Sequence, residues 1–222
     1  MKRKIITTAD GSKTIHIEEW NEQYHSKHGA INEALHVFIK NGLHHTLELV
    51  DERPLKILEI GFGTGLNAFL TSLEAERRKI EIDYVGIEAY PVLVNELEQL
   101  NYVNKIKDSK ESLFKKLHEL SWEERFEVSN NFKLTKRQQF FSDIKDKEQY
   151  HLIYFDAFGA RVQPELWEKD IFQIMYNALK PKGVLVTYAA IGKVKRNMMS
   201  LGFTVERLQG PPGKRHMLRA TK

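Results

Sequence analysis

The sequence contains no cysteine among its 222 residues. This absence excludes disulfide bonds, a thiolate metal site and a cysteine nucleophile. No run of residues approaches the roughly 18 uninterrupted apolar positions that a membrane-spanning helix needs. The basic first residues are also not followed by the apolar stretch of a signal peptide. We therefore expect a cytoplasmic protein with no membrane association.

Proline is scarce, with six residues, and no linker rich in proline and glycine divides the chain. Internal repeats and low-complexity tracts are absent as well. Hydrophobic residues make up 41% and charged residues 29% of the chain, which is ordinary for a globular protein and excludes disorder as the default. We expect one domain over residues 51–222, with residues 1–50 forming a helical and extended N-terminal extension packed on it.

The basic residues are unevenly distributed. The formal net charge is only +4, too small to indicate a polyanionic partner by itself. From Lys193 to Lys222, however, there are eight Lys or Arg residues and one acid, Glu206. A tract of this kind is a candidate contact for a phosphate backbone, with a solvated surface as the alternative.

Short apolar runs alternate with amphipathic stretches. Strands are predicted over residues 55–60, 82–87, 150–155 and 184–188. Helices are predicted from about 66 to 78, from about 108 to 120 and over 171–179, and a further helix around residues 34–43 is predicted to end near Asn41-Gly42. This alternation indicates a parallel sheet with helices on both faces. Residues 203–208 and 216–220, joined by Gly-Pro-Pro-Gly, predict a terminal antiparallel β-hairpin.

Glycine is concentrated directly after the first predicted strand, in Glu59-Ile60-Gly61-Phe62-Gly63-Thr64-Gly65. Glycines let the backbone bend sharply and approach a ligand closely, although a turn that serves packing alone is the alternative. Glu88 ends the next strand, about where an acid hydrogen-bonds ribose hydroxyls. The third glycine follows the second by two residues and not by three, which makes an NAD-dependent enzyme the weaker interpretation.

Asp156 ends the strand over 150–155. The carboxyl ends of strands in an open α/β sheet line the ligand crevice. We therefore predict that this carboxylate is functional, with a helix cap or a loop brace as the alternative. The nine histidines include no His-Glu-x-x-His pattern, and we predict no metal site.

With Glu59 in front of it, the glycine turn resembles the acid-x-Gly-x-Gly-x-Gly signature of class I S-adenosylmethionine-dependent methyltransferases. The terminal hairpin also resembles the end of that fold. The motifs that narrow the resemblance are Gly61-Phe62-Gly63-Thr64-Gly65-Leu66-Asn67, Asp156-Ala157-Phe158 with Pro164-Glu165-Leu166-Trp167, Gly202-Phe203, and Lys214-Arg215-His216-Met217-Leu218. They are similar to the methyltransferase half of the bifunctional tRNA 5-methylaminomethyl-2-thiouridine biosynthesis enzymes and to its free-standing single-domain relatives.

The resemblance runs from about residue 10 to the end and includes Asn21-Glu22-Gln23-Tyr24-His25-Ser26. It departs from the family pattern after Asp156, where Gly159, Ala160 and Val162 replace Ala, Pro and Lys; Arg161 is the adjacent positive charge. The chain leaves no room for the FAD-dependent oxidase half. We therefore expect it to act downstream of a separate oxidase or of the machinery that installs the aminomethyl group.

The resemblance implies a Rossmann-like α/β fold with a C-terminal antiparallel hairpin and S-adenosylmethionine as the cofactor. The implied cofactor-binding residues are Glu59, Gly61, Phe62, Gly63, Thr64, Gly65, Asn67, Glu88, Asp143 and Ile144. Asp143 stands where this fold contacts the adenine, and its alternative is a solvated acid. The implied reaction methylates the exocyclic amine of 5-aminomethyl(-2-thio)uridine at the tRNA wobble position.

For that reaction, Asp156 is the candidate that orients the substrate ammonium and accepts its proton. Phe158 and Tyr188 follow strand ends and either stack on an extruded base or pack in the core. The residues predicted to hold phosphates of the anticodon stem-loop are Lys193, Lys195, Arg196, Lys214 and Arg215.

Three other classes compete with this interpretation. One is a small-molecule amine N-methyltransferase of the same fold. Another is an aminopropyltransferase, which would need a second carboxylate close to Asp156, and the sequence offers none nearer than Glu165. The third is a non-catalytic RNA-binding module, which the intact glycine turn, Glu88 and Asp156 argue against.

Overall fold

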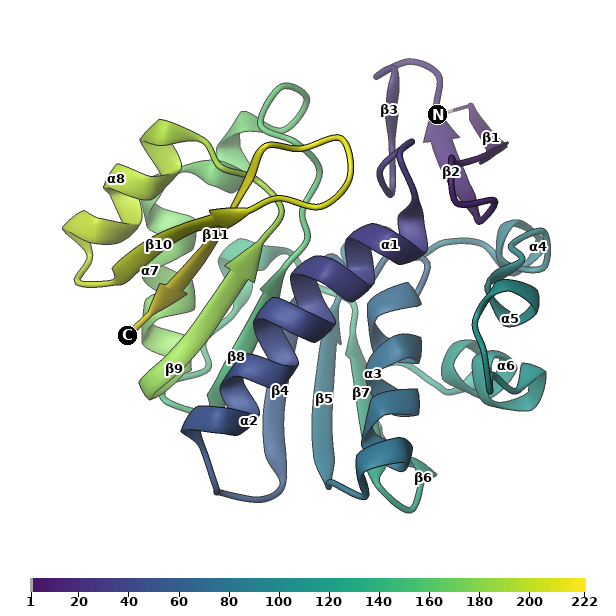
Figure 1. Ribbon diagram of the computed structural model, residues 1–222, viewed down its shortest axis with the longest axis horizontal. Helices are drawn as coiled ribbons and strands as arrows, with labels where there is room; N and C mark the ends of the chain where they lie inside the picture. The colour runs from purple at the N-terminus through teal and green to yellow at the C-terminus, as the bar shows by residue number, and fades with distance from the viewer. Residues whose placement is uncertain (1) are drawn as a thin grey trace.

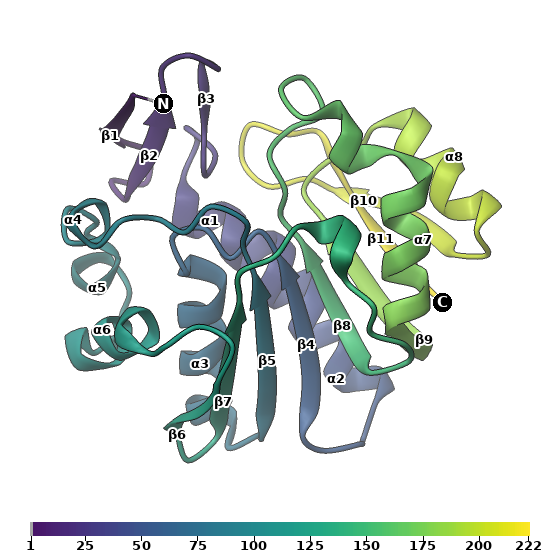
Figure 2. The same cartoon turned by 180° about the vertical axis from the view of Figure 1, so that it is seen from behind.

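The computed structural model describes residues 2–222; Met1, the first residue of the expected N-terminal extension, lies outside the described residues. An eight-stranded sheet forms the centre, in the order β10-β11-β9-β8-β4-β5-β7-β6, and helices cover both of its faces (Figure 1, Figure 2). Its strands are β4 (Leu55–Ile60), β5 (Ile82–Ile87), β6 (Arg125–Ser129), β7 (Phe132–Arg137), β8 (Tyr150–Phe155), β9 (Leu179–Thr187), β10 (Thr204–Gln209) and β11 (His216–Thr221).

The pairing of these strands confirms the predicted fold class. Strands β9, β8, β4, β5 and β7 run parallel, and β11 enters antiparallel between β9 and β10. The fold is therefore an α/β, Rossmann-like sheet of the class I methyltransferase type with a C-terminal antiparallel hairpin. The predicted strand at 184–188 begins earlier, because Leu179 pairs with Tyr150 before an irregularity that brings Leu152 opposite Val184.

The sequence analysis did not predict β6 and β7. Burial alternates strictly along β7, as expected for a strand, but the inward series Phe132, Leu134 and Lys136 includes a charged residue. The Lys136 ammonium is buried, donates to the carbonyl oxygen of His118 at 2.9 Å and lies 5.2 Å from the ring centroid of Trp122. Burial lowers the pKa of Lys136 to about 8. A lysine at a core position hides the apolar alternation that identifies a strand.

The helices divide between the two faces of the sheet. The long N-terminal helix packs on one face with α3 and α6, and α7 and α8 pack on the other (Figure 1, Figure 2). The helical segments are α1 (Ala30–Ala34), η1 (Leu35–His44), α2 (His45–Leu49), α3 (Leu66–Arg78), α4 (Val94–Leu97), α5 (Tyr102–Lys105), α6 (Glu111–Glu119), η2 (Phe141–Asp143), η3 (Pro164–Trp167), α7 (Lys169–Ala178) and α8 (Gly192–Ser200).

The predicted end of the N-terminal helix at Asn41-Gly42 is wrong. Segments α1, η1 and α2 form one continuous helix from Ala30 to Leu49, π-helical in its middle part. A Cβ atom on Gly42 would lie 3.0 Å from Val186 Cγ2 and 3.1 Å from Tyr154 Cε1. This glycine therefore lets the helix approach the sheet closely and does not cap it.

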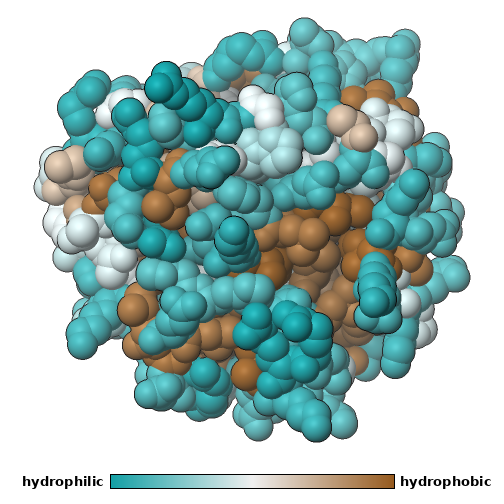
Figure 3. Space-filling view, in the orientation of Figure 1, coloured by the Kyte–Doolittle hydropathy of each residue, from teal (hydrophilic) through white to brown (hydrophobic). Residues whose placement is uncertain are grey.

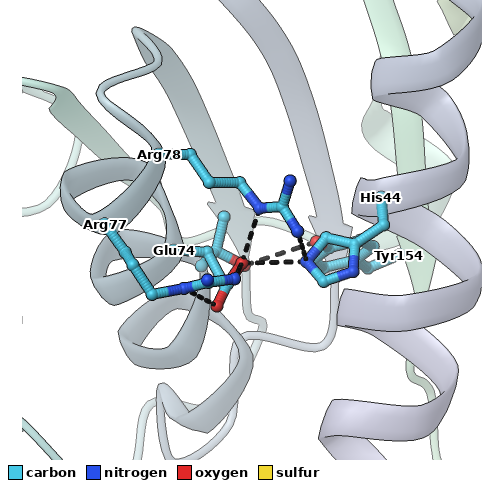
Figure 4. Close-up of polar contacts among 6 residues, drawn as sticks. His44, Glu74, Arg77, Arg78 and Tyr154 are labelled. Carbon is cyan, nitrogen blue, oxygen red and sulfur yellow. Dashed lines mark hydrogen bonds and ion pairs between the residues drawn. The ribbon is translucent and has the colours of Figure 1, made fainter.

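A polar cluster joins this long helix to α3 (Figure 4). The Glu74 carboxylate accepts hydrogen bonds from Arg77, Arg78 and the His44 ring, with the His44 Nε2 atom 2.8 Å away. Burial alone would raise the pKa of Glu74, but these hydrogen bonds outweigh it and lower the pKa to about 2. The cluster therefore holds the two helices together with an ionised carboxylate.

A second, small antiparallel sheet lies beyond the carboxyl ends of the central strands (Figure 1). It consists of β1 (Arg3–Thr7), β2 (Lys13–Ile17) and β3 (Glu22–Gln23). The face seen in Figure 3 is mostly hydrophilic, with apolar patches between the helices, and Leu35 and Leu49 are among the exposed apolar side chains. Within residues 2–222, no helix has the length and apolar character needed to cross a membrane.

Candidate active site

A cavity of about 740 Å³ lies where the carboxyl ends of β4, β5 and β8 meet the small N-terminal sheet and the β10–β11 connection. This volume falls within the range of small-molecule and cofactor sites. Its wall comes from the turn after β4, the segments that follow β5, β8 and β9, the chain from Trp20 to Glu33, and Lys214. The cavity therefore combines the strand ends predicted from the sequence with an N-terminal wall that was not predicted.

The turn after β4 has the close approach that its glycines indicated. Gly61 has a φ of 87°, and a Cβ atom there would lie 2.6 Å from the carbonyl oxygen of Asp156. Gly63 has a φ of 50° and donates its N–H to Glu88 Oε2 at 3.0 Å. Both backbones occupy the left-handed region that favours glycine, so the turn is fixed against two neighbouring strand ends.

Glu88 lies at the end of β5 and lines the cavity. Its Oε2 atom accepts from Gly63, and its Oε1 atom accepts from the Tyr90 N–H at 3.0 Å. Burial raises the pKa of Glu88 in spite of these hydrogen bonds. The carboxylate is thus held by backbone donors beside the glycine turn, in the place predicted for a ribose ligand.

A three-residue polar network joins the ends of β4 and β8. The Asn67 amide nitrogen lies 2.9 Å from Glu59 Oε1 and 2.9 Å from Asp156 Oδ2, and donates to both. Burial, reinforced by the charge of Glu33, raises the pKa of Asp156 to about 7 against the opposing effects of Asn67 and Lys214. Burial also raises the pKa of Glu59 well above its ordinary range, which favours its neutral form. Asp156 is therefore a carboxyl group that exchanges a proton near neutral pH.

Aromatic side chains form the wall next to Asp156. The Phe158 ring makes edge contacts with Trp20 and Tyr24, at centroid distances of 5.5 and 4.9 Å. The Tyr188 hydroxyl donates to the carbonyl oxygen of Ala157 at 2.9 Å. Phe158 and Tyr188 both line the cavity, and so do Trp20 and Tyr24, which were not among the predicted site residues. The signal for Tyr24 was the Asn21-Glu22-Gln23-Tyr24-His25-Ser26 segment, and Trp20 directly precedes that segment.

Glu33 is a further carboxylate of the cavity wall, beside Glu88 and Glu165, and its charge acts on Asp156, whereas no such effect comes from Glu165. This corrects the expectation that no second carboxylate is nearer than Glu165. It stands in the first turn of α1, where its Oε1 atom accepts from the Ser26 N–H at 3.1 Å. Its Oε2 atom pairs with the Lys214 ammonium, which lies 3.8 Å from the centroid of the Tyr188 ring. Glu33 is far from Asp156 in the sequence and reaches the site only because the long helix is packed there. Motif spacing therefore could not predict it.

Several predicted residues lie outside the cavity wall. Asp143 and Ile144 do not line it, whereas Phe140, Phe141 and Ser142, directly before them, do. The basic residues outside the wall are Lys193, Lys195, Arg196 and Arg215. Lys193 pairs with Glu168 at 2.6 Å on the neighbouring element.

Arg161, the charge next to the missing family lysine, does not line the cavity. Its guanidinium donates to the carbonyl oxygens of Trp20 and Asn21, at 2.9 and 3.1 Å, and pairs with Glu22 at 3.2 Å. It thereby ties the loop after β8 to the turn between β2 and β3.

Histidine in this region is structural. His25 is buried between Thr14 Oγ1, 3.0 Å from its Nδ1 atom, and Thr64 Oγ1, 3.4 Å from its Nε2 atom. Burial lowers the pKa of His25 to about 4, so the ring is neutral at pH 7. Among residues 2–222 no three His, Cys, Asp or Glu side chains are grouped so as to hold a metal ion.

A sheet of this strand order, with a glycine turn after β4 and carboxylates at the ends of β5 and β8, has the arrangement of open α/β folds that bind nucleotide cofactors at the carboxyl ends of their strands. The comparison with known families agrees. The model of a family described as S-adenosyl-L-methionine-dependent methyltransferase matches residues 105–222, and the chain belongs to this family. Its cofactor is S-adenosylmethionine.

Relatives extend the match over the whole chain. The tRNA 5-methylaminomethyl-2-thiouridine biosynthesis bifunctional protein MnmC of Delftia acidovorans is 27% identical, over 99% of this chain and 35% of its own length. An uncharacterized protein of Methanocaldococcus jannaschii is 26% identical, over 98% of this chain and 59% of its own length. The chain thus spans about a third to somewhat over half of the length of these curated relatives.

Two solved structures place the fold among known ones. MnmC2 from Aquifex aeolicus superposes with a TM-score of 0.79 at 26% sequence identity, covering 99% of this chain and 69% of that one. Spermidine synthase from Thermotoga maritima has a TM-score of 0.58 at 14% identity, over 99% of this chain and 68% of its own, and shares the fold alone.

Proposed function

We propose that this protein transfers a methyl group from S-adenosylmethionine to the exocyclic amine of 5-aminomethyl(-2-thio)uridine at the wobble position of tRNA. The observation that carries the proposal is the Asp156 carboxyl, with its pKa raised to about 7, in a cavity walled by Phe158 and Tyr188. The names of the MnmC relatives supply the substrate class. The protein would act after a separate oxidase or the machinery that installs the aminomethyl group.

The residues around the glycine turn fit the cofactor. The absence of side chains at Gly61 and Gly63 keeps the backbone open where a nucleoside approaches, and Glu88 offers a carboxylate beside it. We assign Glu59 and Asn67 to positioning, since they support the turn and Asp156 from behind. When bound, S-adenosylmethionine supplies an electrophilic methyl group on a sulfonium, a good leaving group. Phe62 and Thr64 line the cavity and belong to the same proposal. Gly65, Asp143 and Ile144 lie outside its wall, and for them cofactor binding is proposed from the family resemblance alone.

The chemical difficulty of this reaction is that the substrate amine is protonated at neutral pH. An alkylamine titrates near 10.4, as lysine does, and must lose its proton before it attacks. An ordinary aspartate titrates near 3.8, whereas burial raises the pKa of Asp156 to about 7. The difference between the pKa of the amine and that of its proton acceptor is therefore smaller than for an ordinary aspartate, which suits Asp156 to accept the proton directly or through water.

The remaining roles concern the nucleic acid. Phe158 and Tyr188 would stack on the extruded base, since loop bases are bound by stacking and edge contacts. Lys193, Lys195, Arg196 and Arg215 would hold phosphates of the anticodon stem-loop. Lys214, in contrast, is paired with Glu33 inside the cavity wall. Binding should then weaken steeply with salt.

A transfer assay with labelled S-adenosylmethionine tests the proposal. We expect label to enter tRNA that carries 5-aminomethyl(-2-thio)uridine and not tRNA that lacks the aminomethyl group. Label in free alkylamines or polyamines and never in tRNA would contradict the proposal. It would favour a small-molecule amine methyltransferase, or an aminopropyltransferase-like use of Glu33 if a decarboxylated cofactor is consumed. Tight tRNA binding without transfer would indicate an RNA-binding module.

The pH dependence of kcat/KM should have an acid limb near pH 7. Asp156 must be ionised to accept the proton, and its raised pKa of about 7 means that this form is lost as the pH falls below neutrality. The value of kcat/KM reports the ionisation of the free enzyme. Because one group loses its charge, kcat/KM should drop about tenfold per pH unit below the limb. Rate measurements from pH 5 to 9 at fixed ionic strength check this. A rate that stays flat down to pH 5 would exclude Asp156 as the acceptor.

A further inference from the structure

The Lys214 ammonium is held inside the cavity wall. It pairs with the Glu33 carboxylate and lies 3.8 Å from the centroid of the Tyr188 ring. A carboxylate combined with an aromatic face is an arrangement that binds an ammonium group, because the ring quadrupole and the negative charge both attract it. The arrangement was not expected from the sequence, which assigned Lys214 to phosphate.

This ammonium-binding corner adjoins Asp156. The Tyr188 hydroxyl donates to the carbonyl oxygen of Ala157, the residue directly after Asp156, at 2.9 Å. The charge of Glu33 raises the pKa of Asp156 and the charge of Lys214 lowers it, so the three groups lie within electrostatic reach of one another. All of them line the same cavity. An amine that approaches Asp156 therefore enters the field of Glu33 as well.

Glu33 and Lys214 differ in how readily each can leave the ion pair, because they differ in exposure to solvent. The Glu33 side chain is 8% exposed and is fixed by the Ser26 N–H at the start of α1. The Lys214 side chain is 31% exposed and stands on the connection between β10 and β11, which reaches across to the start of the long helix (Figure 1). Lys214 can therefore move into solvent, but Glu33 cannot. A buried carboxylate left alone is strongly unfavourable, so a second cation must replace the one that leaves.

We propose that Glu33 and Tyr188 form an ammonium subsite, which Lys214 fills in the free protein and the aminomethyl ammonium of the substrate takes over on binding. One ammonium replaces another, so the charge beside Glu33 is unchanged. This inference rests on the proposed function and deepens it. Glu33 selects a charged amine, and Asp156 then removes its proton. In the free protein Lys214 keeps the Glu33 carboxylate paired, and the substrate ammonium displaces it on binding.

Calorimetric binding of two nucleosides tests this subsite without turnover. The probes are 5-aminomethyluridine and 5-methyluridine, which lacks the amine, each titrated into protein saturated with S-adenosylhomocysteine. In Lys214→Met the competing ammonium is gone. In the wild type, Lys214 occupies the subsite most of the time, and the apparent affinity is reduced in proportion to the fraction of molecules in which the subsite is free. In the variant, the affinity for 5-aminomethyluridine should therefore rise roughly threefold to tenfold. The affinity for 5-methyluridine should stay the same.

The matched control is Lys222→Met. Lys222 also pairs with a glutamate, Glu148, and lies 4.8 Å from the Tyr176 ring centroid, but it does not line the cavity. Its replacement should leave the preference for the amine unchanged. The double variant Glu33→Gln with Lys214→Met leaves no unpaired charge and keeps the test valid if Lys214→Met alone folds poorly. It should lose roughly tenfold of the amine preference.

Unchanged or weaker binding of 5-aminomethyluridine by a folded Lys214→Met would overturn the proposal. So would a double variant that keeps the wild-type preference for the amine. These outcomes are separate from those of the proposed function. A protein that shows the expected nucleoside preferences but never methylates tRNA would retain the ammonium subsite and lose the tRNA assignment.

Discussion

Replacing Asp156 by asparagine is expected to lower turnover at pH 7 by roughly 10²–10⁴, the range typical for loss of a general base. Asparagine keeps the shape and one acceptor oxygen, so the contact with Asn67 at 2.9 Å has a substitute and the fold should persist. Affinity for S-adenosylmethionine should change little. The measurement is turnover at saturating cofactor, with cofactor binding determined separately by calorimetry.

The pH profile of Asp156→Asn separates a chemical role from a structural one. The wild-type acid limb near pH 7 should disappear, and the rate should instead climb with pH towards the pKa of the substrate amine, since solvent then supplies the free amine. A merely structural Asp156 would lower the melting temperature and give a loss of activity that pH does not restore. Near-full turnover at pH 7 would remove Asp156 from the mechanism and direct attention to Glu165, Glu33 or water.

Replacing Gly63 by valine is expected to weaken S-adenosylmethionine binding by at least roughly tenfold. A left-handed backbone costs an L-residue about 1–2 kcal/mol, and Gly63 has a φ of 50°. A Cβ atom there would also lie 3.1 Å from Tyr24 Cδ1. The turn should relieve both by rotating, which breaks the hydrogen bond from the Gly63 N–H to Glu88 and misplaces the carboxylate.

A matched glycine replacement controls for general effects. Gly192 begins α8, and the nearest atom to a Cβ there is the tip of the flexible Arg196 side chain at 3.4 Å. Gly192→Ala should therefore leave cofactor affinity as in the wild type. Calorimetry and circular dichroism on both variants give the comparison. Wild-type cofactor affinity in a folded Gly63→Val would reduce the turn to a packing element.

The central sheet was predictable because its strands are short apolar runs bounded by turn residues. β4, β5 and β8 begin and end where the sequence predicts. The prediction failed where local pattern and tertiary role diverge. Gly42 resembles a helix cap but serves a close helix–sheet contact, and the buried Lys136 disguises β7 as a polar segment.

The candidate site was predictable where its residues follow strands of one sheet. Glu88 and Asp156 fall at such ends, and the topology brings them into one cavity. Glu33 and Tyr24 come from the N-terminal region, and no spacing rule relates them to Asp156. The basic tract was also a poor guide to Lys214, because a lysine in such a tract can be neutralised by one buried glutamate from a distant element.

Analysis of the nucleosides of tRNA before and after reaction identifies both the methylated nucleoside and the methylated atom. The tRNA is isolated in its aminomethyl form, incubated with the protein and S-adenosylmethionine, digested and examined by mass spectrometry. We expect that 5-aminomethyl(-2-thio)uridine disappears and that 5-methylaminomethyl(-2-thio)uridine appears in equal amount, with the new methyl group on the exocyclic nitrogen. A methyl group on any other nucleoside, with the aminomethyl nucleoside left intact, would contradict it.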